Sequence, residues 1–334
     1  MQTPAVPRLH PQWRVWLAKT LIDGESDAAI SDALYRAGVS PETCAYEIQR
    51  IRRSPIFAGA LAAMRLPLKA LSLFDALAEL QRQRITPLRV LERADPAIFY
   101  DEYYFPNRAV ILRGLTSDWP ASKLWSPDYF ASRFGDVTVE VSDGRNSELR
   151  YEDHIESHMT YSTIGELVRR CALGPSNDFY LIAKNKALSK TDLGPLLEDI
   201  GSLDGFVDTH ADRQVSLWFG PAGTITPLHH DACPILFAQV FGRKRVRLIS
   251  PFELGRVRND RACYSDWDPA SQSTESDATL PPALEADLSP GDVLFIPLGY
   301  WHHVQSLTTS ISLSFTKFLY PPAIWRYQAA EVSL

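Results

Sequence analysis

The 334-residue sequence has no uninterrupted apolar run near the 18 or so residues that a membrane helix needs, and no apolar segment of the signal-peptide kind near its N-terminus. It has no basic excess either, because the formal net charge is −6, and a general nucleic-acid binder needs a basic face. It contains no internal repeat and no low-complexity segment. These absences predict a cytoplasmic protein that binds neither membranes nor nucleic acid.

Cysteine is scarce, and its spacing excludes the common zinc and disulfide frameworks. No two of the four cysteines form a CxxC pair: they are Cys44, Cys171, Cys233 and Cys263. Reduced thiols are expected. The composition, 45% hydrophobic and 22% charged, is ordinary for a globular protein. A chain of this length predicts one large domain with an appendage, or two domains.

Residues 1–85 predict a helical N-terminal domain. Trp13, Trp16, Leu17 and Leu21 follow the stripe of an amphipathic helix. Ser26 and Ser40 precede two further helices as N-caps, and Pro41 takes the first helical position of the second. A last helix is predicted over 56–83, with an interruption at Pro67. The apolar stripes need a surface to cover, which predicts that this domain self-associates, as in a homodimer, or closes over the rest of the chain.

The short helices around AGVSPET allow two interpretations. One is a DNA-binding helix-turn-helix, and the other is a helical hairpin that packs its apolar side on a neighbour. The second helix would present Glu42, Glu47 and Gln49 to a phosphate backbone, with few basic residues before Arg50. The hairpin is therefore favoured.

Residues 86–334 predict a mainly β domain, so the chain as a whole is α+β. Short apolar or alternating segments separated by Gly and Pro are typical of a small barrel or sandwich. The predicted strands are 109–115, 137–143, 178–185, 216–219, 224–228, 235–240, 243–249, 293–297, 303–306 and 310–318. Helices are predicted after Ser126 and over 162–171, and residues 258–286 are predicted to be an insertion.

Three residues predict a metal site. His229 and Asp231 are two residues apart, a spacing that points both side chains to one face of a strand. His302, in GDVLFIPLGYWHHV, is the candidate third ligand. Two histidines and a carboxylate make the facial triad of non-heme Fe(II) oxygenases. His230 and His303 should point to the opposite faces of their strands.

The segments TPLHHD, FAQVFGRKRVRLISP and GDVLFIPLGYWHHV resemble the signature segments of the Jumonji-C/cupin-like oxygenases, with similarity from about Val90 to Tyr320. The bacterial cupin-like group is the nearest match. The resemblance implies a double-stranded β-helix (the cupin, or jelly-roll, barrel), Fe(II) held by His229, Asp231 and His302, and 2-oxoglutarate as cosubstrate. Because the carboxylate is retained at position 231, the resemblance favours hydroxylation.

Lys244 is the candidate partner for the distal carboxylate of the cosubstrate. It lies on the predicted inward face of its strand, where an unpaired ammonium is costly. By resemblance, Tyr180 and Thr226 supply hydroxyl groups, Trp218 and Phe237 wall the pocket, and Ser314 lines it; the alternative for each is an ordinary core or strand residue. Relatives often carry Asn where this chain has Ile235, which makes the predicted pocket more apolar.

Three functions fit these residues. The first is a hydroxylase of a protein or peptide side chain, and the others are a small-molecule hydroxylase and a metal-binding cupin without oxygenase activity. Two acidic segments, Glu148–Glu156 and Asp260–Asp268, lie in predicted connections, where binding residues collect. If they flank the site, they favour a basic peptide. Tyr264 and Trp267 in the second segment are candidate lid aromatics. His154 and His158 in the first are either a helical metal-ligand pair or part of a solvated loop, and the loop is favoured.

Overall fold

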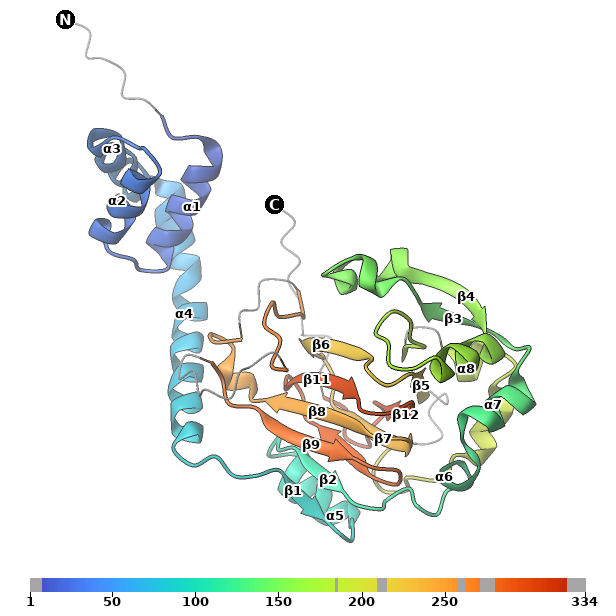
Figure 1. Cartoon of the computed structure of the whole chain (residues 1–334). Coiled ribbons are helices and arrows are strands. Elements are labelled where there is room, and N and C mark those ends of the chain that lie inside the picture. The colour runs from blue at the N-terminus through green and yellow to red at the C-terminus, as the bar shows by residue number, and fades with distance from the viewer. Residues whose placement is uncertain (1–7, 184–185, 209–214, 258–261, 271–279, 323–334) are drawn as a thin grey trace, which may run out of the picture. The chain divides into compact units, whose positions relative to one another are not determined.

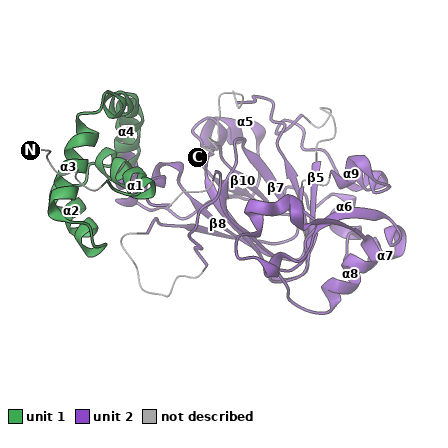
Figure 2. Ribbon diagram, turned by 90° about the horizontal axis from the view of Figure 1, so that it is seen from above, with its two compact units in different colours: residues 1–76 green, residues 77–334 purple. Residues whose placement is uncertain are grey.

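The computed structural model describes residues 8–183, 186–208, 215–257, 262–270 and 280–322, and the chain divides into two compact units, residues 1–76 and 77–334 (Figure 2). The fourth helix crosses this division, which lies nine residues before the domain boundary predicted at 85. That boundary stays a prediction. Each unit is described in turn below.

The first unit is helical, as predicted. Side chains from its helices, among them Leu17, Ile30, Leu34, Cys44 and Ile48, form one apolar core. Ser26 and Ser40 accept hydrogen bonds from the backbone N–H groups of Ala29 and Thr43, so both predicted caps are present. Its helices are α1 (Pro11–Ile22), α2 (Asp27–Arg36), α3 (Pro41–Arg52) and α4 (Pro55–Arg82).

The pairing of charged groups on α3 argues further against a DNA-binding surface. Glu47 is fully buried and forms ion pairs with Arg14 (3.3 Å) and Arg50 (2.7 Å). Arg52 is paired with Asp27. These partners compete with phosphate for the basic groups, which favours the helical hairpin.

Helix α4 differs from its prediction in two respects. It continues through Pro67, so the predicted interruption is wrong; the helix is exposed there, and water can hydrogen-bond the carbonyl oxygen that proline leaves without a backbone donor. It is also long and apolar enough, by length and composition alone, to cross a membrane. Only 6% of its most apolar stretch is buried, so it is not the buried core helix of a globular unit. The sequence shows no uninterrupted apolar run here because Arg65 and Lys69 lie within the helix. The expected absence of a membrane partner stays a prediction.

The second unit is built on two sheets that face one another, with a third small sheet beside them (Figure 1). The six-stranded sheet has the order β1-β2-β10-β7-β12-β5, the four-stranded sheet β6-β11-β8-β9, and β3 pairs with β4. Every pairing is antiparallel except that of β1 with β2. This arrangement confirms the predicted mainly β cupin architecture, which follows the helical N-terminal region along the chain. The strands are β1 (Arg89–Leu91), β2 (Val110–Leu112), β3 (Thr138–Ser142), β4 (Met159–Thr163), β5 (Val215–Gly220), β6 (Ile225–His230), β7 (Ile235–Phe241), β8 (Lys244–Ile249), β9 (Leu284–Leu288), β10 (Val293–Ile296), β11 (Trp301–Ser306) and β12 (Ser310–Phe315).

The apolar core of this unit lies in two layers. Alternate residues of the large sheet, such as Phe237 and Leu294, pack against Val246 and Leu248 of the four-stranded sheet. The intervening residues, such as Leu236 and Phe295, pack in a second cluster with the helical segments. The helices that contribute to this cluster are α5 (Pro96–Phe99), η1 (Tyr100–Tyr104), α6 (Pro120–Leu124), α7 (Pro127–Phe134), α8 (Ile164–Ala172), α9 (Ala187–Lys190) and η5 (Gly194–Asp199). Among the described residues of this unit, three further short helices lie outside it: η2 (Arg145–Ser147), η3 (Tyr151–His158) and η6 (Pro251–Glu253).

Three local predictions for this unit are wrong. Residues 178–183 form no strand, because Tyr180 and Leu181 make only isolated bridges, to Ser142 and Phe219. No strand was predicted over Met159–Thr163, but these residues form β4, which pairs with β3. The insertion predicted to run to residue 286 ends before β9 (Leu284–Leu288), which forms an antiparallel ladder with β8. Arg245–Asp287 and Arg247–Glu285 ion pairs add to this ladder on the outer face.

Candidate metal centre

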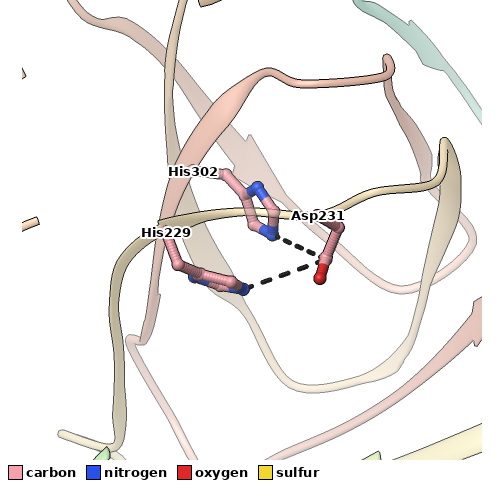
Figure 3. Close-up of side chains that lie close together, drawn as sticks. All are labelled: His229, Asp231 and His302. Carbon is pink, nitrogen blue, oxygen red and sulfur yellow. Dashed lines mark ion pairs between the residues drawn. The ribbon is translucent and has the colours of Figure 1, made fainter. Parts of the chain in front are cut away.

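The three predicted metal ligands come together at one end of the four-stranded sheet (Figure 3). His229 is the last residue but one of β6 and lies next to its pairing partner His302 on β11, and Asp231 follows β6 directly. Their candidate ligand atoms all lie within 4.8 Å of one another. Nε2 of His302 is 3.5 Å from Oδ2 of Asp231, and Nε2 of His229 is 3.9 Å from the same oxygen. Adjacent ligands each about 2.1 Å from a metal lie about 3 Å apart, so small side-chain movements would close this group around an ion.

Hydrogen bonds fix the protonation of both rings in the form a metal requires. Nδ1 of His229 lies 2.8 Å from the carbonyl oxygen of Pro227, and Nδ1 of His302 lies 3.0 Å from that of Tyr300. A carbonyl oxygen only accepts, so Nδ1 donates in each ring, which leaves the lone pair on Nε2. Both lone pairs are on the side of Asp231. The donor set therefore fits a divalent metal, with the backbone carbonyls orienting the ligands.

The charge state of the site also suits a cation. Burial, together with the nearby charge of His302, lowers the pKa of His229 to about 4, so its ring is neutral near pH 7. Burial alone would raise the pKa of Asp231, but its interactions with the two neighbouring imidazoles, His302 and His229, outweigh burial and lower that pKa, so the carboxyl group is ionised. An ionised carboxylate beside a neutral imidazole is the state in which these groups bind metal.

A β-bulge places Thr226 on the same face as the ligands. Thr226 is three residues before His229, and in a regular strand that spacing would put the two side chains on opposite faces. Here Val304 pairs with Thr226 and His302 pairs with His229, with a register shift between the two pairs. Since Val304 and His302 share a face, their partners do too.

Lys244 and the predicted pocket residues form a second group. Lys244 is fully buried, and its Nζ donates to the hydroxyl of Tyr180 at 2.6 Å. Nζ also lies 5.3 Å from the ring centroid of Phe237. Trp218 packs near Tyr180 and donates through Nε1 to Oγ of Ser314 at 3.1 Å. Thr226 is joined to this group only by its position on the inward face.

Sequence comparison places this architecture in a family. The family model described as "Cupin-like domain" matches residues 96–325. The chain belongs to the cupin-like domain family.

Several curated relatives of this cupin-like domain protein carry the names of demethylases or hydroxylases. Lysine-specific demethylase 8 of Xenopus tropicalis is 32% identical over 228 residues, which are 65% of this chain and 49% of that protein. Lysine-specific demethylase JMJ30 of Arabidopsis thaliana is 33% identical, over 69% of this chain and 55% of the relative. The bifunctional peptidase and (3S)-lysyl hydroxylase JMJD7 of Homo sapiens is 26% identical, over 66% of this chain and 80% of the relative. The chain thus spans about half the length of the first two.

The two acidic segments of this cupin-like protein meet beside the metal group. Tyr264 forms a β-bridge with His229, with ring centroids 5.6 Å apart. Arg150 of the first segment forms an ion pair with Asp266 of the second at 3.1 Å. Burial raises the pKa of Tyr264, and nearby acidic groups, among them the buried Glu152, raise it further. Residues 258–261, which include part of the second predicted segment, lie outside the described part of the chain.

Two predictions about these segments need correction. Trp267 is no lid, because it is buried with Leu228, Val257 and Trp301. His158 is also buried rather than solvated, and it and the exposed His154 both lie against Glu148, at 3.3 Å and 2.7 Å. Among the described residues the only candidate metal group is that of His229, Asp231 and His302, so the histidine pair offers no second one.

Arg145 is a residue that sequence reasoning missed. It is buried, stacks over the ring of Tyr151 (4.2 Å), and donates through Nη2 to the Tyr151 hydroxyl and to the carbonyl oxygen of Ile225. Asn177 accepts from the backbone N–H of Ile225 at 2.8 Å. Together they bind the outer edge of β6 next to Thr226. The polar sequence around Arg145 gave no signal of this, because its partner is 80 residues away.

Proposed function

We propose that this protein is an Fe(II)- and 2-oxoglutarate-dependent oxygenase that hydroxylates a side chain of a protein or peptide. The observation that carries the proposal is the metal group, in which two imidazole Nε2 atoms and one carboxylate converge. When bound, Fe(II) and 2-oxoglutarate supply the oxidising chemistry: dioxygen gives one oxygen atom to a substrate C–H bond and one to 2-oxoglutarate, which leaves as succinate and carbon dioxide.

The protein residues have separate tasks in this proposal. His229, Asp231 and His302 hold the metal on one face, leaving other positions open. Lys244 and Tyr180 bind the distal carboxylate of 2-oxoglutarate, with Thr226 as a further hydroxyl, while Trp218, Phe237 and Ser314 enclose it. The burial of Lys244 supports this assignment, because a buried ammonium that lacks a carboxylate partner among the described residues is satisfied by an anionic ligand.

A basic side chain is the proposed target. Tyr264 packs beside His229, and the carboxyl group of Glu152 is near enough to Tyr264 to add to the effect of burial on its pKa. A carboxylate together with an aromatic face binds cationic groups. The names of the relatives refer to lysine, and that of arginine-specific demethylase JMJ20 of Arabidopsis thaliana to arginine. Arg145 lies beside Tyr151 and opposes a cation there, so Glu152 is the group on which this proposal depends.

The function is tested by turnover on a peptide library. With Fe(II), ascorbate and 2-oxoglutarate, we expect succinate release and the gain of one oxygen atom by peptides that contain lysine or arginine, read by mass spectrometry. Asp231→Ala is the inactive control. Modification of a small molecule but of no peptide would favour the small-molecule hydroxylase. Metal binding without any succinate would favour a non-oxygenase cupin.

Glu152 should control recognition of the cationic substrate. We expect Glu152→Gln, which keeps the shape and removes the charge, to raise the KM for a basic peptide by about tenfold or more, because an ion pair shielded from water is lost. The difference should be larger at low salt than at high salt if steering of the peptide contributes. Glu156→Gln, an exposed acid in the same segment, is the matched control, with a change of less than about twofold. Equal effects in the two variants would contradict the assignment.

Lys244 should make cosubstrate binding depend on pH. Burial lowers its pKa to about 7, so it is charged below that pH and neutral above it. Only the charged form attracts a carboxylate, and above about pH 7 a proton must be taken up on binding. We therefore expect the affinity for 2-oxoglutarate to fall as pH rises from about 7 to about 9, by up to about tenfold per unit. Calorimetry on the Mn(II)-loaded protein measures this slope, which Lys244→Met should abolish. The same pH dependence of 2-oxoglutarate affinity in the wild type and in Lys244→Met would contradict the assignment of Lys244 as the carboxylate partner.

A further inference from the structure

The exposed apolar surface of α4 follows a regular pattern. Six residues recur at alternating spacings of three and four, which places them on one stripe of the helix. All six are exposed, and the large ones strongly so: Ile56 by 85%, Leu66 by 75% and Leu73 by 58%. We call this stripe the α4 seam; it consists of Ile56, Gly59, Ala63, Leu66, Ala70 and Leu73, all within the first unit.

The side of α4 that the protein itself covers is a different one. Phe57 directly follows Ile56, so its side chain points to a different side of the helix, and it is buried in the core of the first unit. The charged residues Arg65, Lys69 and Asp75 also lie outside the seam. A helix with a charge-free apolar stripe that is exposed to water is typical of a surface that another helix covers.

We propose that the α4 seam binds the α4 seam of a second copy of this chain, with the two helices antiparallel. The argument is one of size. In an antiparallel pair, Ala63 lies opposite Leu73 of the second copy, and Leu66 lies opposite Ala70. Ala63 and Ala70 thus each receive a leucine of the second copy, and the two-fold axis repeats both contacts. A parallel pair would instead place each alanine opposite an alanine and each leucine opposite a leucine. The leucine pairs would hold the helices apart and leave gaps at the alanine pairs.

A lipid bilayer is the competing occupant, and the charges disfavour it. A helix crossing a membrane would carry Arg65 and Lys69 into hydrocarbon near its middle, where each charge is costly. In a helix pair the same side chains stay in water, because they lie beside the seam or away from it. This inference does not depend on the proposed enzymatic function, because no residue of the metal group or the Lys244 group takes part.

The first test measures the mass of the full-length protein in solution. We expect a dimer at about 10 µM by sedimentation. Leu66→Glu combined with Leu73→Glu should raise the dissociation constant at least about a hundredfold, because four charges enter an apolar contact. The matched control is Leu68→Glu, an apolar residue of the same helix that is 37% exposed on the other side and should leave the dimer intact. Circular dichroism and thermal melting verify that each variant is folded.

The second test reads the direction of the pair. A mixture of the Leu66→Cys and Ala70→Cys variants should give a disulfide-linked heterodimer under mild oxidation, whereas either variant alone should cross-link no more than the wild type. Self-cross-linking of the separate variants would overturn the antiparallel arrangement. A wild-type protein that stays monomeric, or a seam double variant that still dimerises, would overturn the seam itself. Binding of the wild type, but not of the double variant, to phosphatidylcholine vesicles would assign the seam to lipid instead.

Discussion

Asp231→Ala and His302→Ala should each abolish stable Fe(II) binding and succinate release. Each substitution removes one of three convergent ligands, and loss of an outer group that merely orients a ligand already costs about 10- to 100-fold in metal affinity. Loss of a ligand should therefore weaken binding by more than about a hundredfold. Anaerobic titration with Fe(II), or with Mn(II) followed by magnetic resonance, measures the affinity without requiring turnover.

His230→Gln is the matched control for this experiment. His230 is next to His229 on the same strand, but its ring packs edge-on to Trp301, with centroids 4.4 Å apart, on the opposite face. Its replacement should leave one metal bound per chain. Unchanged affinity in both ligand variants, with intact folding, would refute the metal assignment and the oxygenase proposal with it.

Lys244→Met should weaken 2-oxoglutarate binding at least about thirtyfold while leaving metal affinity nearly unchanged. Truncating one partner of a desolvated charge pair costs about 2–5 kcal/mol, and methionine keeps most of the volume of the buried side chain. Calorimetry on the Mn(II)-loaded protein measures the binding directly. The melting temperature should not fall, because the substitution removes an unpaired charge from the core.

Lys123→Ala is the control for a general loss of positive charge, since Lys123 lies on the short surface helix α6 and is exposed. A change of less than about threefold in Lys244→Met would place the carboxylate elsewhere. The apolar region near Ile235 would then be the first to examine, because relatives often carry a polar residue there.

Local periodicity was sufficient to predict most of this fold. The alternation along β8 correctly separated Lys244, Val246 and Leu248, which are buried, from Arg245 and Arg247, which form ion pairs on the outer face. The backbone of a strand points successive side chains to opposite faces, so the sequence of a single strand is enough to predict which side chains share a face. The capping serines were predicted for the same reason, since their partners are three residues away.

The remaining features depend on contacts between distant parts of the chain. The register shift that turns Thr226 toward the ligands is visible only once β6 is paired with β11. Arg145 lies in a segment of ordinary polar composition, and its role follows from Ile225, which is far away in sequence. Trp267 looked like a lid aromatic because it is surrounded by acids, but tertiary packing placed it in the core.

The register shift in β6 also bears on which length changes this chain can tolerate during evolution. The spacing of three between Thr226 and His229 and the bulge compensate for each other: one residue more or fewer in this stretch, with the bulge kept, would turn either the threonine or the histidine away from the site. The surface connections carry no such constraint, because their residues are not counted against a partner strand. Among descendants of this sequence, insertions should therefore accumulate in the loops and avoid these four positions, even where the individual side chains between the two ends are free to vary.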